Sequence, residues 1–292
     1  MASTIVLKGR IKSIKNTRQI TTAMQLVSAS KMRRAQDYAF RSRAYRDMAL
    51  SLLQRLNATR DVQNQPLFTV RPVNSRLYIV ITSNSGLAGA YNANVLKLLA
   101  QGLRADKESG TKSKVVVIGS KGAQFVRRLR EVELVAVYSS FGDRPTANDV
   151  RPILNTLIQQ YADADVDEVR LLYTLFKSNI VQEVQTMQLL PASVIDDDKD
   201  GAPDTPLLST FEPNVETVID QVTTRLIEAQ IWQALLESLA SEHSMRMISM
   251  KNATDNANDL IDDYTLEYNT ARQAGITQEL AEITGGAEAL NG

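Results

Sequence analysis

Few side chains in this sequence could perform catalysis or bind a metal ion. Histidine occurs once, at His243, and cysteine is absent from all 292 residues. Without cysteine there is no disulfide, no thiolate nucleophile and no thiolate metal ligand. A lone histidine inside a stretch of helix-forming residues is better explained by a structural or interface role than by catalysis. The sequence therefore predicts no catalytic residue, no metal centre and no cofactor.

One polar segment resembles the start of a calcium-binding loop. Asp196, Asp198 and Asp200 occupy its first, third and fifth positions, and Gly201 occupies the sixth. The twelfth position, where a calcium loop requires a bidentate glutamate, is Leu207. Two prolines also interrupt the segment, so we do not expect it to bind calcium.

Two glycine-containing turns each follow a predicted strand. They span residues 85–89 (Ser-Gly-Leu-Ala-Gly) and 119–122 (Gly-Ser-Lys-Gly). A helix that begins directly after such a turn can bind phosphate at its N-terminus. Neither turn has the glycine and lysine spacing of a P-loop or of a dinucleotide fingerprint. We expect ordinary strand-to-helix turns here, with phosphate binding as the alternative.

Charge is distributed unevenly along the chain although the net charge is zero. Residues 1–60 contain 13 basic and two acidic residues, whereas residues 212–292 contain four basic and 14 acidic residues. Such asymmetry suggests two segments that attract each other or that face different partners. A basic helix can also bind nucleic acid, but aromatic residues are few in this one and no base-reading motif is present. We therefore expect no nucleic-acid binding.

Two long stretches of the chain lack both glycine and proline. They are the elements that must hold the charged residues in place. Residues 10–65 form one such stretch and residues 214–274 the other, and both are rich in helix-forming residues. Apolar residues recur in them at alternating spacings of four and three, the pattern of a coiled-coil seam. Because the rest of the chain lies between them, the two helices most simply pair antiparallel. The alternative is two separate helices packed on a globular body.

The middle of the chain shows short apolar strands alternating with helical segments. Predicted strands cover residues 76–82, 114–119, 134–138, 169–175 and 181–190, and predicted helices cover residues 92–103, 122–130 and 147–161. This alternation indicates an α/β domain with a largely parallel sheet covered on both faces. The predicted organisation is an N-terminal coiled-coil helix (1–65), a Rossmann-like α/β domain (66–208) and a C-terminal coiled-coil helix (209–292).

The two ends of the chain carry motifs that resemble the γ subunits of F-type ATP synthases. These motifs occupy residues 9–24, 27–35, 241–247, 250–257, 265–283 and 286–290. The resemblance extends over essentially the whole chain and is to the bacterial type, without the cysteine-bearing insertion of plastid relatives. It implies the same fold, two terminal helices in an antiparallel coiled coil and an α/β domain.

The resemblance also implies a function. A γ subunit is the non-catalytic central stalk whose rotation couples the membrane c-ring to ATP synthesis or hydrolysis in the β subunits of the α3β3 ring. Expected partners are that ring, the ε subunit and the c-ring, on the cytoplasmic face of the bacterial plasma membrane. No stretch reaches the ~20 apolar residues that cross a bilayer, so membrane association is expected through the c-ring alone. The alternative function is a free-standing α/β nucleotide-binding protein with helical arms.

Several residues match family positions that contact the ring of α and β subunits. Met24 and Arg246 match positions near the acidic lever of β, and Lys31, Arg33 and Arg34 add positive charge to the same part of the shaft. Further along, the residues that match positions facing the upper sleeve of the ring are Arg272, Gln273, Thr277, Glu279 and Glu282.

Two places depart from the usual family pattern. After the first strand the family usually has Ser-Asp-Arg-Gly, whereas this chain has neutral Asn84 and Ser85 at the two charged positions. Thr22 stands where many relatives carry lysine. The first departure calls a local ion pair of the α/β domain into question, and the second is expected to weaken the contact with β.

Overall fold

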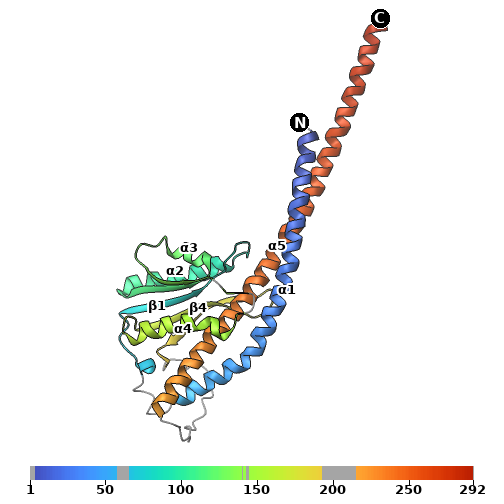
Figure 1. Cartoon of the computed structure of the whole chain (residues 1–292). Coiled ribbons are helices and arrows are strands. Elements are labelled where there is room, and N and C mark those ends of the chain that lie inside the picture. Colours follow the sequence, from blue (N-terminus) through green and yellow to red (C-terminus); the bar gives the residue numbers. More distant parts are fainter. Residues whose placement is uncertain (1–3, 58–65, 140, 143–144, 193–214, 292) are drawn as a thin grey trace. The chain divides into compact units, whose positions relative to one another are not determined.

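The computed structural model describes residues 4–57, 66–139, 141–142, 145–192 and 215–291, without the side chains at 44–47, 49–57, 215–219 and 288–291. The elements in chain order are α1 (Thr4–Asn57), the 3-10 helix η2 (Pro66–Phe68), β1 (Ser75–Ile81), α2 (Tyr91–Ser109), β2 (Lys112–Ile118), α3 (Ser120–Val126), β3 (Glu133–Tyr138), α4 (Ala147–Ala162), β4 (Glu168–Phe176), β5 (Gln182–Leu190) and α5 (Val215–Asn291). The predicted α/β class with two long terminal helices is confirmed (Figure 1).

The chain divides into two compact units, and both long helices contribute to each. Unit 1 comprises Met1–Ser28 and Met247–Gly292, and unit 2 comprises Ala29–Arg246. The helix α5 has 77 residues and continues past Gly275, where the glycine-free stretch ends. A Cβ atom at Gly275 would meet nothing within 4 Å, so close packing does not require a glycine at this position.

Unit 2 contains a five-stranded sheet with the order β3-β2-β1-β4-β5. The first four strands are parallel, and β5 pairs antiparallel with β4. Because β1 lies in the middle, its side chains are buried on both faces, as expected for a strand of a parallel sheet. Leu77 and Ile79 point to one face, and Tyr78 and Val80 point to the other.

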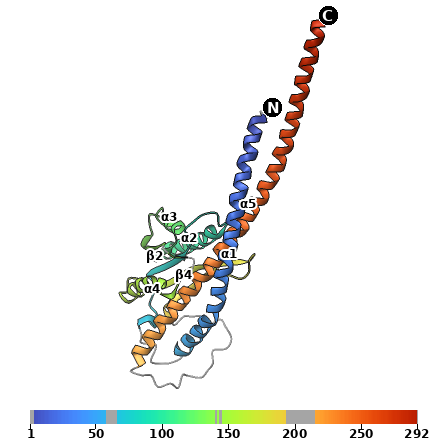
Figure 2. The same ribbon diagram turned by 45° about the vertical axis from the view of Figure 1, so that its right-hand side comes forward.

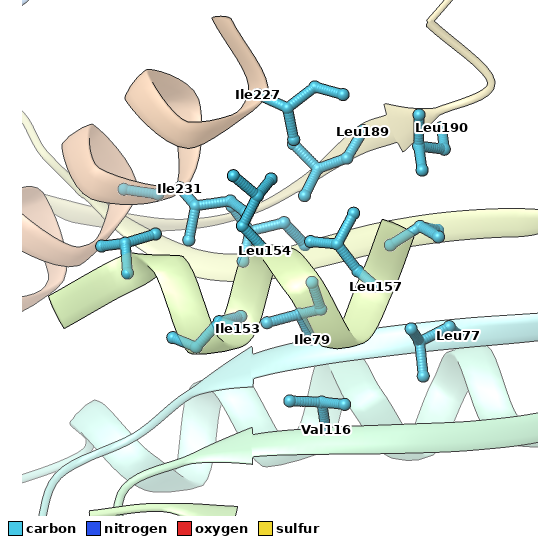
Figure 3. Packing of buried hydrophobic residues seen from close by; sticks show 14 of the residues in the cluster. Leu77, Ile79, Val116, Ile153, Leu154, Leu157, Leu189, Leu190, Ile227 and Ile231 are labelled. Carbon is cyan, nitrogen blue, oxygen red and sulfur yellow. The ribbon is translucent and has the colours of Figure 1, made fainter. Parts of the chain in front are cut away.

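Helices cover both faces of this sheet. On one face α2 and α3 contribute Val95, Leu99 and Val126 to an apolar cluster with the even-numbered side chains of β1. On the other face α4 packs with the unit 2 part of α5, and Figure 3 shows Leu157 of α4 and Ile227 of α5 in that larger cluster. The predicted two-layered cover of the sheet is therefore confirmed, with α5 itself forming part of the core.

The amino-terminal edge of the sheet is held by a buried network of charges. Arg76 of β1 lies between two carboxylates, with 2.6 Å between its Nε and Glu168 and a close contact to Asp106. Asp106 is only 1% exposed and also accepts hydrogen bonds from the hydroxyls of Tyr78 and Ser113. Burial raises the pKa of the Tyr78 hydroxyl, so the hydroxyl stays protonated and donates. The network satisfies each of its charges, as burial requires.

Unit 1 is an antiparallel pair of helices (Figure 2). Along α1 the less exposed positions include 4, 7, 11, 14, 18, 21, 25 and 28, and along the end of α5 they include 250, 254, 257, 261, 264, 268 and 271. Both series alternate steps of three and four, which is the seam of a coiled coil. Thr21 bonds Thr254 at 2.8 Å and Arg18 bonds Asn258 at 3.2 Å, so rising numbers in α1 meet falling numbers in α5. The predicted antiparallel pairing is confirmed.

Candidate partner-binding surfaces

The last part of α5 extends beyond the seam of unit 1. Every side chain from position 276 to position 287 is exposed, although the helix continues unbroken to Asn291. Three of these side chains are large and apolar: Ile276, Leu280 and Ile283 are 49%, 58% and 68% exposed. Their spacing of four and three places them on one side of the helix. In proteins, a helix gains most of its stability from packing such an apolar side against a partner.

The five residues predicted to face the upper sleeve of the ring lie on this exposed end or next to it. All of them are exposed, and they are Arg272, Gln273, Thr277, Glu279 and Glu282. The Thr277 hydroxyl donates to the backbone carbonyl of Gln273, and Gln278 donates to Glu282 at 2.9 Å. Their remaining polar groups point to solvent and can meet another surface.

The apolar side chains among these residues were not singled out from the sequence. The signal was present, since Ile276, Leu280 and Ile283 repeat the four-three spacing of the seam beyond the point where α1 begins. Sequence alone could not show that this stretch has no partner among the residues that the structure describes. Within the described residues no part of α1 covers this stripe.

Met24 and Thr22 lie in unit 1. Met24 is partly exposed on α1, one residue before the seam position at 25. Thr22 is exposed, and its hydroxyl donates to the carbonyl of Arg18 at 2.8 Å. At the position where many relatives carry a lysine, this chain therefore presents a hydroxyl already bonded to its own helix.

Lys31, Arg33 and Arg34 lie on the α1 segment of unit 2. Arg33 and Arg34 are exposed, and Lys31 is partly exposed. The guanidinium of Arg34 donates to the Ser30 hydroxyl at 3.1 Å, one turn earlier. The three cations thus form a basic surface on one helix, within reach of solvent and of an acidic partner.

Arg246 differs from the other predicted residues because it is buried. Its side chain belongs to a residue only 7% exposed and lies 2.7 Å from the Glu242 carboxylate. It donates to the carbonyls of Ser85 and Gly86 and to the Ser85 hydroxyl, the last at 3.0 Å. His243 contributes a ring nitrogen 3.4 Å from the same guanidinium. The sole histidine is therefore buried beside this arginine.

This network explains how the neutral residues after β1 are accommodated. Ser85 accepts from Arg246, and the Asn84 side-chain oxygen accepts from the backbone N–H and the hydroxyl of Ser120 at the start of α3. The turn is held further by Asn92, whose amide bonds both the backbone and the hydroxyl of Ser83. Hydrogen bonds of neutral Asn84 and Ser85 thus occupy the positions where the family pattern usually has charged residues.

The carboxyl ends of β1 and β4, where doubly wound sheets usually bind nucleotides, are covered by α5. Ser238 accepts from the backbone N–H of Thr174 in β4, and Ser241 donates to the carbonyl of the same residue. Tyr91, at the start of α2, is 1% exposed, and burial beside the Glu242 carboxylate raises the pKa of its hydroxyl. Side chains of this chain fill the crevice, which argues against the nucleotide-binding alternative at this site.

The two glycines of the second turn, residues 119–122, serve close packing. A Cβ atom at Gly119 would lie 2.1 Å from the carbonyl oxygen of Thr82, and its φ of +101° also favours glycine. A Cβ atom at Gly122 would lie 2.7 Å from Val117. The helix α3 that follows has only seven residues. The interpretation as ordinary strand-to-helix turns accounts for both glycines.

The described residues contain no group of three or more histidine, cysteine, aspartate or glutamate side chains that could hold a metal ion. The calcium-like segment starting at Asp196 lies outside the described residues. Among the helices of the described part of the chain, none is both long and apolar enough to span a membrane.

Comparisons with known proteins agree with the features at both ends of the chain. A family model described as ATP synthase matches residues 3–290. The ATP synthase gamma chain of Moorella thermoacetica is 40% identical over 97% of this chain and 98% of its own length. That of Herpetosiphon aurantiacus is 42% identical over the full length of both chains. This chain therefore belongs to the ATP synthase γ-chain family.

Solved structures show the same fold at lower sequence identity. A chain of the Euglena gracilis mitochondrial ATP synthase, described as OSCP/F1/c-ring, aligns with a TM-score of 0.70 at 17% identity, over 98% of this chain and 94% of that one. A chain of the Tetrahymena thermophila mitochondrial enzyme, described as central stalk/c-ring, aligns with a TM-score of 0.62 at 24% identity, over 80% of this chain and 99% of that one.

Proposed function

We propose that this chain is the rotating central stalk of a bacterial ATP synthase and performs no catalysis itself. The observation that carries the proposal is the end of α5, a helix of exposed residues with an apolar side that no part of the described chain covers. Solved relatives of the same fold are described as central stalk or rotor of ATP synthases. ATP chemistry belongs, on this proposal, to the surrounding β subunits.

The exposed end of α5 is the part that enters the α3β3 ring. Ile276, Leu280 and Ile283 supply apolar contact there, while Arg272 and Glu279 supply polar contacts. A shaft has to leave each set of contacts as it turns, so its contacts should be numerous and individually weak. Exposed ion pairs, at about 0–1 kcal/mol each, meet that requirement.

The basic surface of unit 2 is proposed to meet the acidic lever of β. Lys31, Arg33 and Arg34 provide its charge, and Met24 provides an apolar contact of unit 1 to the same subunit. For Arg246 we propose an indirect contribution: it fixes the Ser85–Gly86 turn, next to which Leu87 is 62% exposed.

Family membership supports a proposal for the remaining partners. We infer that the α/β domain, residues 66–208, rests with the ε subunit on the c-ring at the cytoplasmic face of the plasma membrane. Ion flow through the c-ring then turns the whole stalk. The terminal helices, residues 1–65 and 209–292, rotate inside the α3β3 ring. Membrane attachment is indirect on this proposal.

Reconstitution with the matching α and β subunits tests the proposal. We expect sustained ATP hydrolysis by a stable assembly only when the chain is present, and no hydrolysis by the chain alone. The variant Arg272→Ala/Glu279→Ala/Glu282→Ala should assemble poorly or couple poorly. A matched control removes one basic and two acidic exposed residues elsewhere in unit 1, with the substitutions Lys251→Ala/Asp262→Ala/Asp263→Ala.

The control variant should support turnover close to that of the unaltered chain. If both triple variants behave alike, the exposed end of α5 has no special part in the contact. If the chain neither joins the α and β subunits nor changes their activity, the proposed function is wrong.

A further inference from the structure

A cavity of about 730 Å³ lies at the amino-terminal edge of the sheet in unit 2, near the β3 side. Its walls come from the end of α2, the start of β2, α3 with the loop that follows it, and the start of β3. The volume falls within the roughly 300–1,000 Å³ of small-molecule sites. This edge is opposite to the one that α5 covers, and none of the interactions of Arg246 reaches it.

Basic residues dominate the rim of this cavity. Six of its lining residues are basic (Arg104, Lys107, Lys112, Lys114, Arg128 and Arg130), and two are acidic, Glu131 and Glu133. Both acids are already paired, since Glu131 lies 2.5 Å from Lys107 and Glu133 lies 3.8 Å from Lys114. Four positive charges are left in excess around one opening.

The four remaining cations make no ion pair within the described part of the chain. Arg104 lies on α2, Lys112 begins β2, and Arg128 and Arg130 follow α3, so they approach the cavity from three separate segments. All four are exposed, so solvent screens their charges and they remain available to a ligand.

The floor of the cavity is apolar. Leu103 and Phe125 line it from α2 and α3, and Val132 lines it from the segment before β3; all three are partly buried. Low-polarity walls below a rim of one sign of charge focus the electrostatic field into the cleft and concentrate counter-ions there. Such a site suits a ligand with an apolar body and an anionic group.

We propose that this cavity binds a phosphate-bearing ligand whose apolar part packs on the floor while Arg104, Lys112, Arg128 and Arg130 contact the phosphate. Guanidinium groups favour phosphate because they donate paired hydrogen bonds to its oxygens. Nucleotides and anionic lipid headgroups both carry this chemistry. The proposal goes beyond the stalk function and does not depend on it, because none of the residues proposed to contact the α3β3 ring lines the cavity.

Binding to the purified full-length chain tests the proposal. The soluble probes are ADP, ATP and inorganic pyrophosphate, measured by titration calorimetry. The membrane probes are vesicles of phosphatidylglycerol, compared with vesicles of phosphatidylcholine, measured by co-sedimentation. At least one phosphate probe should bind, and for a soluble probe the stoichiometry should be one per chain.

A pair of variants with equal loss of charge separates a built site from diffuse attraction. Arg104→Gln/Arg128→Gln removes two rim cations and should weaken binding about tenfold or more. Lys97→Gln/Arg127→Gln removes two exposed cations from the same segments that do not line the cavity, and binding should stay within about twofold. Ala100→Glu, at an exposed lining position of α2, should also weaken binding.

Circular dichroism establishes that each variant is folded before binding is compared. Binding of nucleotides or pyrophosphate identifies a soluble phosphate ligand, whereas binding of phosphatidylglycerol vesicles alone identifies a headgroup; either result supports the site. Absence of binding by every probe overturns the proposal, and so does an equal loss in the two double variants.

Discussion

Two stretches of the same helix, α5, follow opposite rules. From position 226 to position 246 most residues are buried although many are polar, including Gln233, Glu237 and Ser238. From position 276 to position 287 all residues are exposed although Ile276, Leu280 and Ile283 are large and apolar. Burial in α5 is therefore not set by the polarity of its own residues. It is set by what the rest of the protein brings against each stretch.

The buried stretch shows how polar residues become structural. Ser238 and Ser241 bond the backbone of β4, Ser244 donates to the carbonyl of Asn179, and Gln233 donates to the carbonyl of Ala39 in α1. A buried polar group costs free energy unless it is paired, so these positions tolerate few alternatives. In the exposed stretch no described residue needs such a partner from within the chain, so its side chains are free to match another subunit.

Two arginines of α5 give the largest expected contrast. Arg246→Met should lower the free energy of unfolding by about 3–5 kcal/mol, because it leaves the Glu242 carboxylate buried without its cation. Arg272→Met removes an exposed cation and should change the same quantity by less than about 0.5 kcal/mol. Urea unfolding followed by circular dichroism measures both. Equal effects of the two substitutions would break the comparison.

Two glycines extend the contrast to the backbone. Gly119→Ala should destabilise by about 3 kcal/mol or more, since the new Cβ atom would meet the Thr82 carbonyl and the residue would keep a left-handed φ. Gly285→Ala lies in the exposed part of α5, where a Cβ atom has open space, and should favour the helix by about 1 kcal/mol. Unfolding curves for Gly119→Ala and helix content for Gly285→Ala check the two signs.

The buried tyrosine that touches α5 gives a smaller, pH-dependent effect. Tyr91→Phe loses the hydrogen bond with Ser238 and should cost about 1–2 kcal/mol near neutral pH. Because burial raises the pKa of Tyr91 above its usual 10.0, the protonated hydroxyl stabilises the fold below that pH, and the stabilisation is lost as the pH rises further. Stability measured at about pH 8 and about pH 11 should therefore fall more in the unaltered chain than in Tyr91→Phe. A steeper fall in the variant would contradict the assignment.

The seam of unit 1 should give the smallest effect. The Thr21 and Thr254 hydroxyls lie 2.8 Å apart, and each also lies within hydrogen-bonding distance of a carbonyl of its own helix. Because each hydroxyl carries one proton, two of these three hydrogen bonds form at a time. Replacing both with valine removes a polar pair as a unit, so the change in unfolding free energy should be about 1 kcal/mol or less, in either direction. The single variant Thr21→Val tests whether the pair acts as a unit. A loss of several kcal/mol in the double variant would show that the threonines specify the pairing.

Much of this fold could be predicted from the sequence because its signals are local. Long stretches without glycine or proline predicted α1 and α5, and runs such as Leu77–Ile81 predicted the strands. The antiparallel pairing followed from the four-three spacing and from the place of the middle segment in the chain. The residues of the exposed end of α5 were identified only through the resemblance, since on their own they look like any solvated helix face.

What the sequence could not predict depends on contacts between distant segments. Arg246 looks like another cation of a helix surface, and only the structure shows that it is enclosed by Glu242 and the turn at Ser85. In the same way the four rim cations of the cavity come from three segments, and no spacing in the sequence connects them. A glycine in open space weakens a helix without ending it, which is why α5 continues past Gly275.

The row of buried serines on α5 has a consequence for how the chain is made. Ser238 accepts a hydrogen bond from the backbone of β4. The partners of α1 lie far along the chain, since Arg18 donates to Asn258, 240 residues later. During synthesis, α1 and the whole sheet therefore leave the ribosome before α5, the helix that packs against both, has been made. Apolar positions such as Leu7 must wait for nearly the entire chain, which predicts slow folding and a need for protection of the nascent protein.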